Sequence, residues 1–288
     1  MSSNIIFVGG PGRSGTSFVA DRIGRHNEVA TFQDVELKIF TEFGGLLDMQ
    51  SVLVECFSPN RAEVIFRQFR NMIKSVRTGG YGQPALEGLV SVEYLNSLEE
   101  KLYSRLQPEG YIGRLDYPTF NSAAREFLQD LAAIALEKKA GARSFLEKTP
   151  HNCLQPQFLH EIAPTARYLH IYRNPKAIAA SLLNQPWGPT QLEHAIIWVQ
   201  SYFEAWLKAH AHFKRLGLPL ADYRIEDISK DPKTKSEDIC SHLGLTVNDE
   251  MFTGANIGQL DGWKTKMPKD AYKLLDQKLD PLCEVLGY

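Results

Sequence analysis

The segment GGPGRSGTSF, at positions 9–18, follows the apolar run IIFV at positions 5–8. An apolar run of this kind predicts a buried parallel strand over 4–9, and the pattern after the glycines predicts a helix from Thr16 to Arg25. A glycine-rich loop between such a strand and helix directs backbone N–H groups and the positive end of the helix dipole toward one point. The segment therefore predicts a phosphate-binding loop rather than a turn that only packs a strand against a helix.

The loop differs from a nucleotide-triphosphate loop in one essential residue. Such loops read GxxxxGK[ST], and Gly10 and Gly15 keep the glycine spacing, but Thr16 stands where a lysine would contact the β- and γ-phosphates. A different cation, Arg13, lies inside the loop. We therefore expect the loop to bind a phosphate-like anion through backbone and side-chain donors. The candidate donors are Gly12, Arg13, Ser14, Gly15, Thr16 and Ser17.

Strand and helix patterns alternate along the rest of the chain, without an internal repeat. Further strands are predicted at 29–32, 144–148 and 166–173, and further helices at 190–215, 233–243 and 268–286. The region 36–140 is predicted to be mainly helical, and its clearest helix is expected at 121–139 with Asn121 as the N-cap. These patterns predict a fold of the α/β class over a single domain, residues 1–288. We expect a P-loop-like, three-layer fold with a central parallel sheet and a large helical insert at 36–140.

The composition of the 288-residue chain argues against several classes of protein. Its formal net charge of -2 does not fit a dedicated nucleic-acid-binding protein, which carries a cationic excess. Its four cysteines are widely spaced and predict neither a disulfide framework nor a zinc site. No apolar run approaches the length of about 18 residues that a membrane span needs, and no targeting segment precedes the first strand. We expect a soluble cytoplasmic protein; its oligomeric state has no signature in the sequence.

A second candidate anion-binding motif occurs at RNPKAIAAS, positions 173–181. It begins where the predicted strand at 166–173 ends, and Pro175 opens a helix that carries Ser181. In kinases and GTPases, a later strand normally ends in an aspartate that holds magnesium. Because an arginine stands here instead, we expect Arg173 and Ser181 to bind a second, separate phosphate.

Together, PGRSGTS and RNPKAIAAS resemble the two nucleotide motifs of the sulfotransferases that use 3'-phosphoadenosine 5'-phosphosulfate (PAPS). The resemblance implies that the first loop holds the 5'-phosphosulfate and that Arg173 and Ser181 hold the 3'-phosphate. Four more segments are similar to parts of that family: FLEKTPHN (145–152), DYRIEDISKDP (222–232), HLGL (242–245) and GQLDGWKTKMP (258–268). The last segment adds Trp263 and Lys264 to the nucleotide-binding candidates. Because Ile225 replaces a tyrosine of many relatives and the 258–264 loop lacks the full glycine spacing, the resemblance implies no particular contacts to adenine.

The resemblance also implies a reaction, the transfer of a sulfuryl group from PAPS to a hydroxyl acceptor without a required metal. Such a transfer needs cations at the reacting group and a base for the acceptor's proton. Lys148, at the end of a predicted central strand, is the candidate cation for the leaving oxygen, and Arg13 is the second catalytic cation. By alignment with tyrosylprotein and glycan sulfotransferases, Asp34 is the first candidate base and Glu36 the second. His151, one position beyond the histidine of the cytosolic small-molecule branch, is the third.

The acceptor and two competing functions stay open at this point. The carboxylate candidates and the EKTP segment favour the branch whose acceptors are glycans, tyrosine peptides or bacterial metabolites, without separating these three. A P-loop kinase is disfavoured by the missing lysine and aspartate, and a non-catalytic nucleotide-binding protein is disfavoured by the retained Lys148. Trp198, Tyr202 and Trp206 recur every four residues, which is more typical of a helix face in the core than of a surface that stacks on a sugar.

Overall fold

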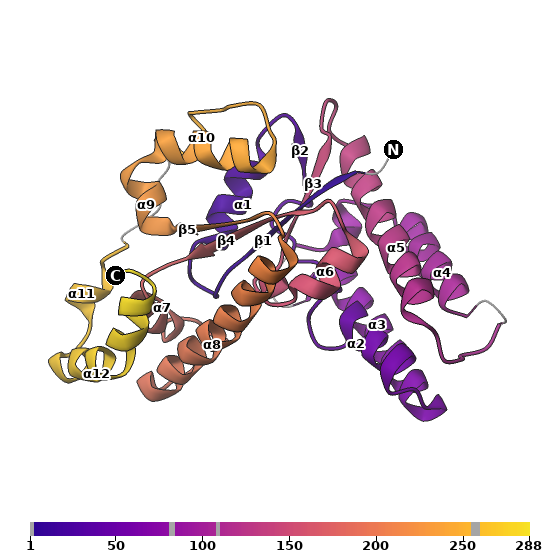
Figure 1. The fold of residues 1–288 in the computed structure, drawn as a ribbon, viewed down its shortest axis with the longest axis horizontal. Coiled ribbons are helices and arrows are strands. Elements are labelled where there is room, and N and C mark those ends of the chain that lie inside the picture. The colour runs from indigo at the N-terminus through magenta and orange to yellow at the C-terminus, as the bar shows by residue number, and fades with distance from the viewer. Residues whose placement is uncertain (1–2, 81–83, 108–109, 255–259) are drawn as a thin grey trace.

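The computed structural model describes residues 3–80, 84–107, 110–254 and 260–288. Within these residues the chain forms a five-stranded parallel sheet in the order β2-β3-β1-β4-β5 (Figure 1). The strands are β1 (Asn4–Gly9), β2 (Val29–Ala30), β3 (Ser144–Lys148), β4 (Arg167–Tyr172) and β5 (Leu220–Arg224). The four predicted strands are present. β5 is an additional strand that the sequence pattern did not reveal, because its residues are largely polar and none of them is fully buried.

The central position of β1 brings three strand ends together. β1 lies between β3 and β4. Val8 of β1 pairs with Lys148 of β3, and Gly9 pairs with His170 of β4. The segments that follow these three strands therefore leave the sheet at the same carboxyl edge. In open α/β sheets, ligands bind at this edge where the strand order reverses, which here is beside β1.

Helices cover both faces of the sheet and complete three layers (Figure 1). Ile6 and Val8 of β1 belong to the core on one face, whereas Ile5 and Phe7 belong to the larger core on the other face. Successive residues of a strand point to opposite faces, so both sides of β1 are buried. The helices on the first face are α1 (Thr16–Gly24), α9 (Ile225–Lys230) and α10 (Pro232–Leu243), and those on the second are α5 (Tyr117–Glu137), α6 (Pro156–Ile162) and α8 (Leu192–Leu216). The predicted three-layer α/β class is confirmed.

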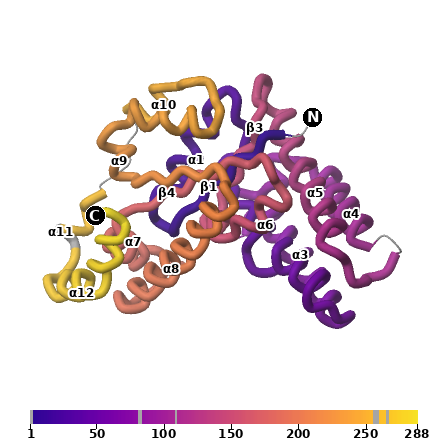
Figure 2. The backbone as a smooth tube through the Cα atoms, in the orientation of Figure 1, coloured from indigo at the N-terminus to yellow at the C-terminus, as the bar shows by residue number. Residues whose placement is uncertain are grey.

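The helical insert extends from one side of the sheet, where α3 and α4 lie in Figure 2. It contains α2 (Leu46–Gln50), a π-helical turn (Ser51–Glu55), α3 (Pro59–Thr78), a 3₁₀ turn (Leu86–Gly88) and α4 (Val92–Leu106), and it leads into α5. Ser58 and Ser91 cap α3 and α4 by accepting backbone N–H bonds from Arg61 and Tyr94. The expected helical character of this region is confirmed.

The predicted start of α5 is wrong by four residues. The helix begins at Tyr117, and the N-cap is Asp116, whose carboxylate accepts the Thr119 N–H at 2.8 Å. Pro118 fits the first turn because no intrahelical partner is available there for an N–H. Asn121 lies inside the helix instead, and its side chain accepts a hydrogen bond from Gln50 at 2.6 Å.

The remaining helices enclose the other side of the molecule. They are α7 (Pro175–Leu182), α11 (Trp263–Lys266) and α12 (Lys269–Val285). α12 packs against α7 and α8, and Lys176 on α7 pairs with Asp276 at 2.6 Å and with Asp280. In the part of the chain that the structure describes, no helix is both long enough and apolar enough to cross a membrane.

Candidate active site

The loop after β1 is fixed to both neighbouring strands. The Gly10 N–H donates to the carbonyl of Pro150, just beyond β3, at 2.9 Å. The buried Ser14 hydroxyl donates to the carbonyl of Ile171 in β4 at 2.7 Å. A Cβ atom at Gly10 would lie 2.0 Å from that same carbonyl oxygen, so only glycine fits. Ser14, a predicted ligand, therefore uses its hydroxyl to hold the loop in place.

Arg13 occupies the exposed tip of this loop. Its φ of 70° lies in the left-handed region, which is strained for a residue with a side chain. Its Nε donates to the Ser181 hydroxyl of α7 at 3.2 Å. Gly15 also has a positive φ, of 96°, and is the N-cap of α1, whose first residues are Thr16 and Ser17. The structure thus brings the predicted first and second motifs into contact.

Arg173 lies beside this contact, immediately after β4. One of its Nη atoms donates to the carbonyl of Leu260 at 2.5 Å, while its buried Nε has no hydrogen-bond partner among the described residues. Burial lowers the pKa of Arg173; the nearby carboxylate of Glu226 opposes this shift, and the charge of Arg13 adds to it. The loop after β1 and the end of β4 thus each carry a guanidinium group, and Arg13 contacts the Ser181 hydroxyl, which is an arrangement that favours bound anions.

The segment with Trp263 and Lys264 approaches the same region through Leu260. The carbonyl of Trp263 accepts a hydrogen bond from Tyr272 at 2.9 Å, and Lys264 pairs with Asp261 at 2.9 Å. The buried indole Nε1 of Trp263 has no partner among the described residues. Gly258 and Gln259, the start of the predicted nucleotide loop, lie outside the described residues.

Lys148, the last residue of β3, is almost completely buried beside the loop. Its ammonium group donates to the Ser17 hydroxyl at 3.0 Å and forms an ion pair with Glu36. Glu36 also lies 3.5 Å from the ammonium group of Lys38. The Glu36 carboxylate, a candidate base, and the Lys148 ammonium group, a candidate cation for the leaving oxygen, are thus in direct contact at the carboxyl edge of the sheet.

A buried carboxylate holds the segment of Glu36 in place. Glu147 of β3 accepts hydrogen bonds from the backbone N–H of Leu37 at 3.2 Å, from the Thr149 hydroxyl at 2.7 Å and from the Asn152 amide. Burial raises the pKa of Glu147 to about 7, although these hydrogen bonds oppose the shift. The sequence analysis missed Glu147. A charged residue within an otherwise apolar strand was the signal that could have identified it.

Asp34 and Glu36 face different cavities. Asp34 is exposed, has a φ of 61° and lines a cavity of about 50 Å³ together with Ser17 and Lys148. Glu36 lines a second cavity, of about 210 Å³, on the side of Gly12. The first two candidate bases therefore lie on two sides of Lys148, and only Glu36 forms an ion pair with it.

His151, the third candidate base, lines the larger cavity opposite α8. Its Nδ1 is hydrogen-bonded to Glu42 at 2.8 Å. This hydrogen bond raises the pKa of His151, and burial opposes the shift. His151 lies in the short turn between β3 and the 3₁₀ turn Asn152–Leu154, so the end of β3 presents both Lys148 and His151 to the site.

The three aromatic residues of α8 divide between core and cavity. Trp206 is buried in the core, where its ring stacks on His170. Tyr202 is buried as well but reaches the wall of the larger cavity, and Trp198 lines the same wall while 44% exposed. The expectation of core packing is thus correct for Tyr202 and Trp206. Among the described residues, no group of three or more His, Cys, Asp and Glu side chains is arranged to hold a metal ion.

The family model described as the sulfotransferase family matches residues 92–249, just over half of the chain. The chain belongs to this family. The matched range of the sulfotransferase runs from α4 to the segment after α10 and includes Lys148, Arg173 and Ser181, whereas the loop at 9–18 precedes it. Family membership and fold support sulfuryl transfer as the general chemistry. A comparison with curated proteins gave no match.

One solved structure supports the same fold. The sulfotransferase domain of the Synechococcus PCC 7002 olefin synthase has a TM-score of 0.52 and 16% identity, over 99% of this sulfotransferase and 94% of that chain. A sulfotransferase from Alicyclobacillus acidocaldarius has a TM-score of 0.49 and 15% identity, over 98% of this chain and 93% of that one. At such low identity, the first likeness establishes the arrangement of sheet and helices alone.

Proposed function

We propose that this sulfotransferase transfers the sulfuryl group of PAPS to the hydroxyl group of an acceptor. The donor site fits a nucleotide with two separate phosphate groups. Arg13 lies in the loop after β1 and contacts Ser181, whereas Arg173 follows β4 and its buried Nε has no partner among the described residues. An unpaired buried donor costs free energy unless a ligand accepts from it, which a phosphate oxygen does.

The donor site is assigned as follows. The Gly12–Ser17 loop, apart from the Ser14 hydroxyl that fixes it to β4, holds the 5'-phosphosulfate, while Arg173 and Ser181 hold the 3'-phosphate. Trp263 and Lys264 lie on the nucleotide side, near Leu260. PAPS supplies the sulfuryl group. Lys148, beside Ser17, stabilises the negative charge that develops on the leaving oxygen.

The ion pair of Lys148 and Glu36 is the observation that most strongly supports this proposal. It places a carboxylate next to the leaving-group cation and on the wall of a cavity that also contacts Gly12 of the loop. We assign Glu36 as the base that takes the acceptor's proton and keep Asp34 and His151 as the alternatives. Glu36 ranks ahead of Asp34 because it alone of the two both pairs with Lys148 and lines that cavity. His151 lines the same cavity, where its hydrogen bond is to Glu42.

A comparison of Glu36→Gln with Asp34→Asn tests the assignment. Loss of a positioned general base lowers kcat about 10²- to 10⁴-fold, so Glu36→Gln is expected to show this loss and Asp34→Asn less than a threefold change. The measurement is kcat at saturating PAPS and acceptor, with melting temperature and PAP (3'-phosphoadenosine 5'-phosphate) affinity as controls for folding and donor binding. If Asp34→Asn is inactive and Glu36→Gln is active, Asp34 is the base. If both are active, His151→Ala decides.

Thermal shifts separate the proposed donor from other nucleotides. PAP at about 100 times its dissociation constant stabilises the fold by about 2.7 kcal/mol. We expect this shift in the absence of magnesium. A shift with ATP and magnesium but none with PAP would favour a kinase, and PAP binding without turnover on any hydroxyl acceptor would favour a non-catalytic protein.

A further inference from the structure

Half-exposed tryptophans form one wall of the larger cavity. Trp187, in the segment between α7 and α8, is 55% exposed, and Trp198 of α8 is 44% exposed. Their rings meet edge to face with centroids 6.0 Å apart. Large aromatic side chains that stay accessible beside one another mark a surface that a ligand covers. Ile178, Leu182 and Val199 extend this apolar wall.

Tyr202, which lines the cavity, is held in place by contacts with Pro150 and His170. The Tyr202 hydroxyl lies 3.4 Å from the carbonyl of Pro150 and 3.4 Å from Nε2 of His170. His170 is completely buried on β4, and its Nδ1 is hydrogen-bonded to Asp222 at 2.9 Å. This chain of contacts holds the Tyr202 ring, so the part of the cavity that Tyr202 lines is formed before a ligand binds.

The opposite rim is charged, and its charges are paired with one another. Glu36 lies against Lys148 and Lys38, and Glu42 is hydrogen-bonded to His151. A ligand therefore does not need to bring a net charge of its own. The rim requires only a hydroxyl group that can reach Glu36, and the rest of the ligand faces the apolar wall.

The size and polarity of the cavity define a class of acceptor. Its volume of about 210 Å³ lies below the range of about 300–1,000 Å³ that is typical of pockets for drug-sized ligands. A sugar chain or a peptide needs hydrogen-bond partners along its length, whereas the described lining of this cavity is mostly apolar. We infer that the acceptor is a small, uncharged molecule whose hydroxyl group is carried on an apolar ring, with the ring against Trp187 and Trp198. This inference rests on the proposed function for the role of the hydroxyl, but not for the binding of the ring.

Calorimetric titration with 2-naphthol tests the inference without turnover. The Trp187→Ala variant removes one ring of the wall, and Tyr94→Ala removes an exposed aromatic side chain of α4, outside the cavity, as the matched control. We expect saturable naphthol binding to the wild type, at least a tenfold weaker affinity in Trp187→Ala, and a change of less than about twofold in Tyr94→Ala. N-acetylglucosamine and a short acidic tyrosine peptide are the competing probes.

The outcomes distinguish failure of the proposed function from failure of the proposed ring-binding site. Tighter binding of the sugar or the peptide than of naphthol overturns the inference, as do an unchanged naphthol affinity in Trp187→Ala and an absence of saturable naphthol binding. PAP binding is titrated separately on the same variants. Naphthol binding without PAP binding removes the proposed function and leaves the ring site in place, whereas PAP binding without naphthol binding does the reverse.

Discussion

The proposed donor side and the proposed acceptor side of the site are built from different parts of the fold. Arg13, Lys148 and Arg173 follow or end the three central strands, so the sheet sets their positions. Glu36 comes from an irregular segment after β2, and Trp187 from the segment between α7 and α8. The sheet thus fixes the cations of the donor side, whereas side chains on connecting segments shape the acceptor side.

This difference in origin predicts that residues at the strand ends determine the reaction, whereas residues on the connecting segments determine which acceptor binds. A substitution at a strand end changes the charge that the reacting group meets, because the backbone there is locked by the sheet. A substitution on a connecting segment changes which acceptor fits while leaving the donor site intact. If this division is correct, variants of the two sides differ in which constant they change, kcat or PAP affinity on one side and acceptor affinity on the other.

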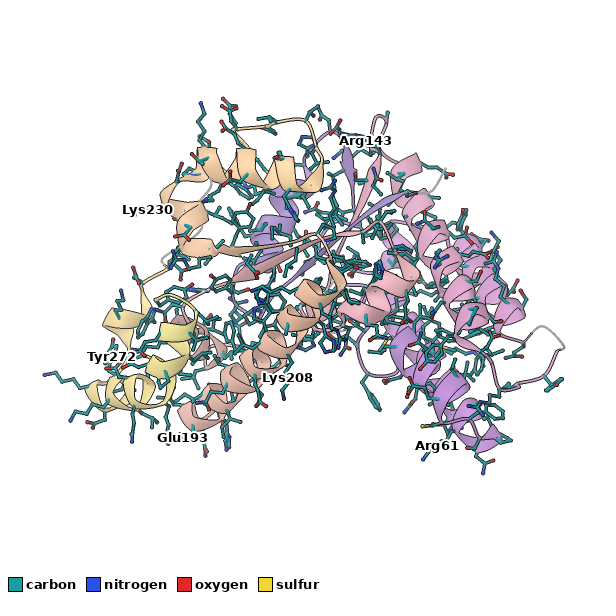
Figure 3. All side chains as sticks on the ribbon, viewed as in Figure 1. Arg61, Arg143, Glu193, Lys208, Lys230 and Tyr272 are labelled. Carbon is teal, nitrogen blue, oxygen red and sulfur yellow. The ribbon has the colours of Figure 1, made fainter. Side chains whose placement is uncertain are left out.

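After the variants of the candidate bases, the largest loss of kcat is expected for Lys148→Ala. The charge that Lys148 stabilises develops mainly in the transition state, so kcat is expected to fall about 10²- to 10³-fold while PAP affinity changes only a few-fold. The measurements are kcat at saturating substrates and PAP affinity by calorimetry. Lys208→Ala is the control, because Lys208 lies on the exposed surface of α8, away from the sheet edge (Figure 3). An equal loss of PAP affinity and kcat would show that Lys148 mainly binds the nucleotide, which would contradict its assignment to the leaving oxygen.

Arg173→Ala is expected to have an intermediate effect, confined to the donor side. Loss of charge-assisted hydrogen bonds worth about 1.5–3 kcal/mol weakens PAP about 10- to 100-fold. ADP, which lacks the 3'-phosphate, should lose less than about threefold. Titration calorimetry with both nucleotides measures the contrast, and Arg61→Ala, at the exposed start of α3 (Figure 3), is the control. Equal losses of affinity for PAP and ADP would show that Arg173 does not bind the 3'-phosphate.

The smallest effect is expected for Glu147→Gln, and it appears in the pH dependence of stability. Burial raises the pKa of Glu147 from 4.5 to about 7. The folded protein therefore keeps a proton on Glu147 at pH values where the unfolded chain has released it, so its contribution to the free energy of unfolding falls as pH rises from 4.5 to about 7. Glutamine removes this dependence. Between about pH 5 and pH 7.5, the wild type should lose about 1–3 kcal/mol relative to the variant in denaturant unfolding.

Glu147→Gln also tests the link between β3 and the acceptor side. The variant is expected to keep PAP affinity within about twofold while kcat changes a few-fold, because the carboxylate holds Leu37 next to the base and touches no donor residue of the loop. An identical pH profile for wild type and variant would mean that Glu147 is ionised throughout the range. A loss of PAP affinity would mean that β3 transmits the change to the donor side.

The donor side could be predicted from the sequence because its signals are local. A buried strand, a glycine-rich loop and a helix start occupy consecutive positions around Arg13, and a buried strand and a proline-initiated helix flank Arg173. Their meeting through Ser181 follows from the parallel arrangement of β1 and β4. The predicted contacts of these residues with PAPS remain predictions.

The acceptor side could not be predicted in the same way, because its geometry depends on segments without a repeating pattern. Positive φ values at Asp34 and Lys38 turn the segment after β2, so that Glu36 rather than Asp34 meets Lys148. No periodicity in the sequence indicates such turns. The contact of Trp187 with Trp198 likewise joins a turn to a helix, and its signal was limited to two large aromatic residues near the start of one helix.

The two sides are not independent, because one contact crosses between them. A methyl group at Gly12 would lie 3.7 Å from the edge of the Trp187 ring, so the anion loop and the aromatic wall pack against each other. A nucleotide that shifts the loop therefore also shifts the wall, and a bound ring shifts the loop in turn. Thermodynamic reciprocity requires each ligand to change the affinity of the other by the same factor. The contact between Gly12 and Trp187 is therefore one route by which the two ligands act on each other, including in a complex that holds PAP and the acceptor together.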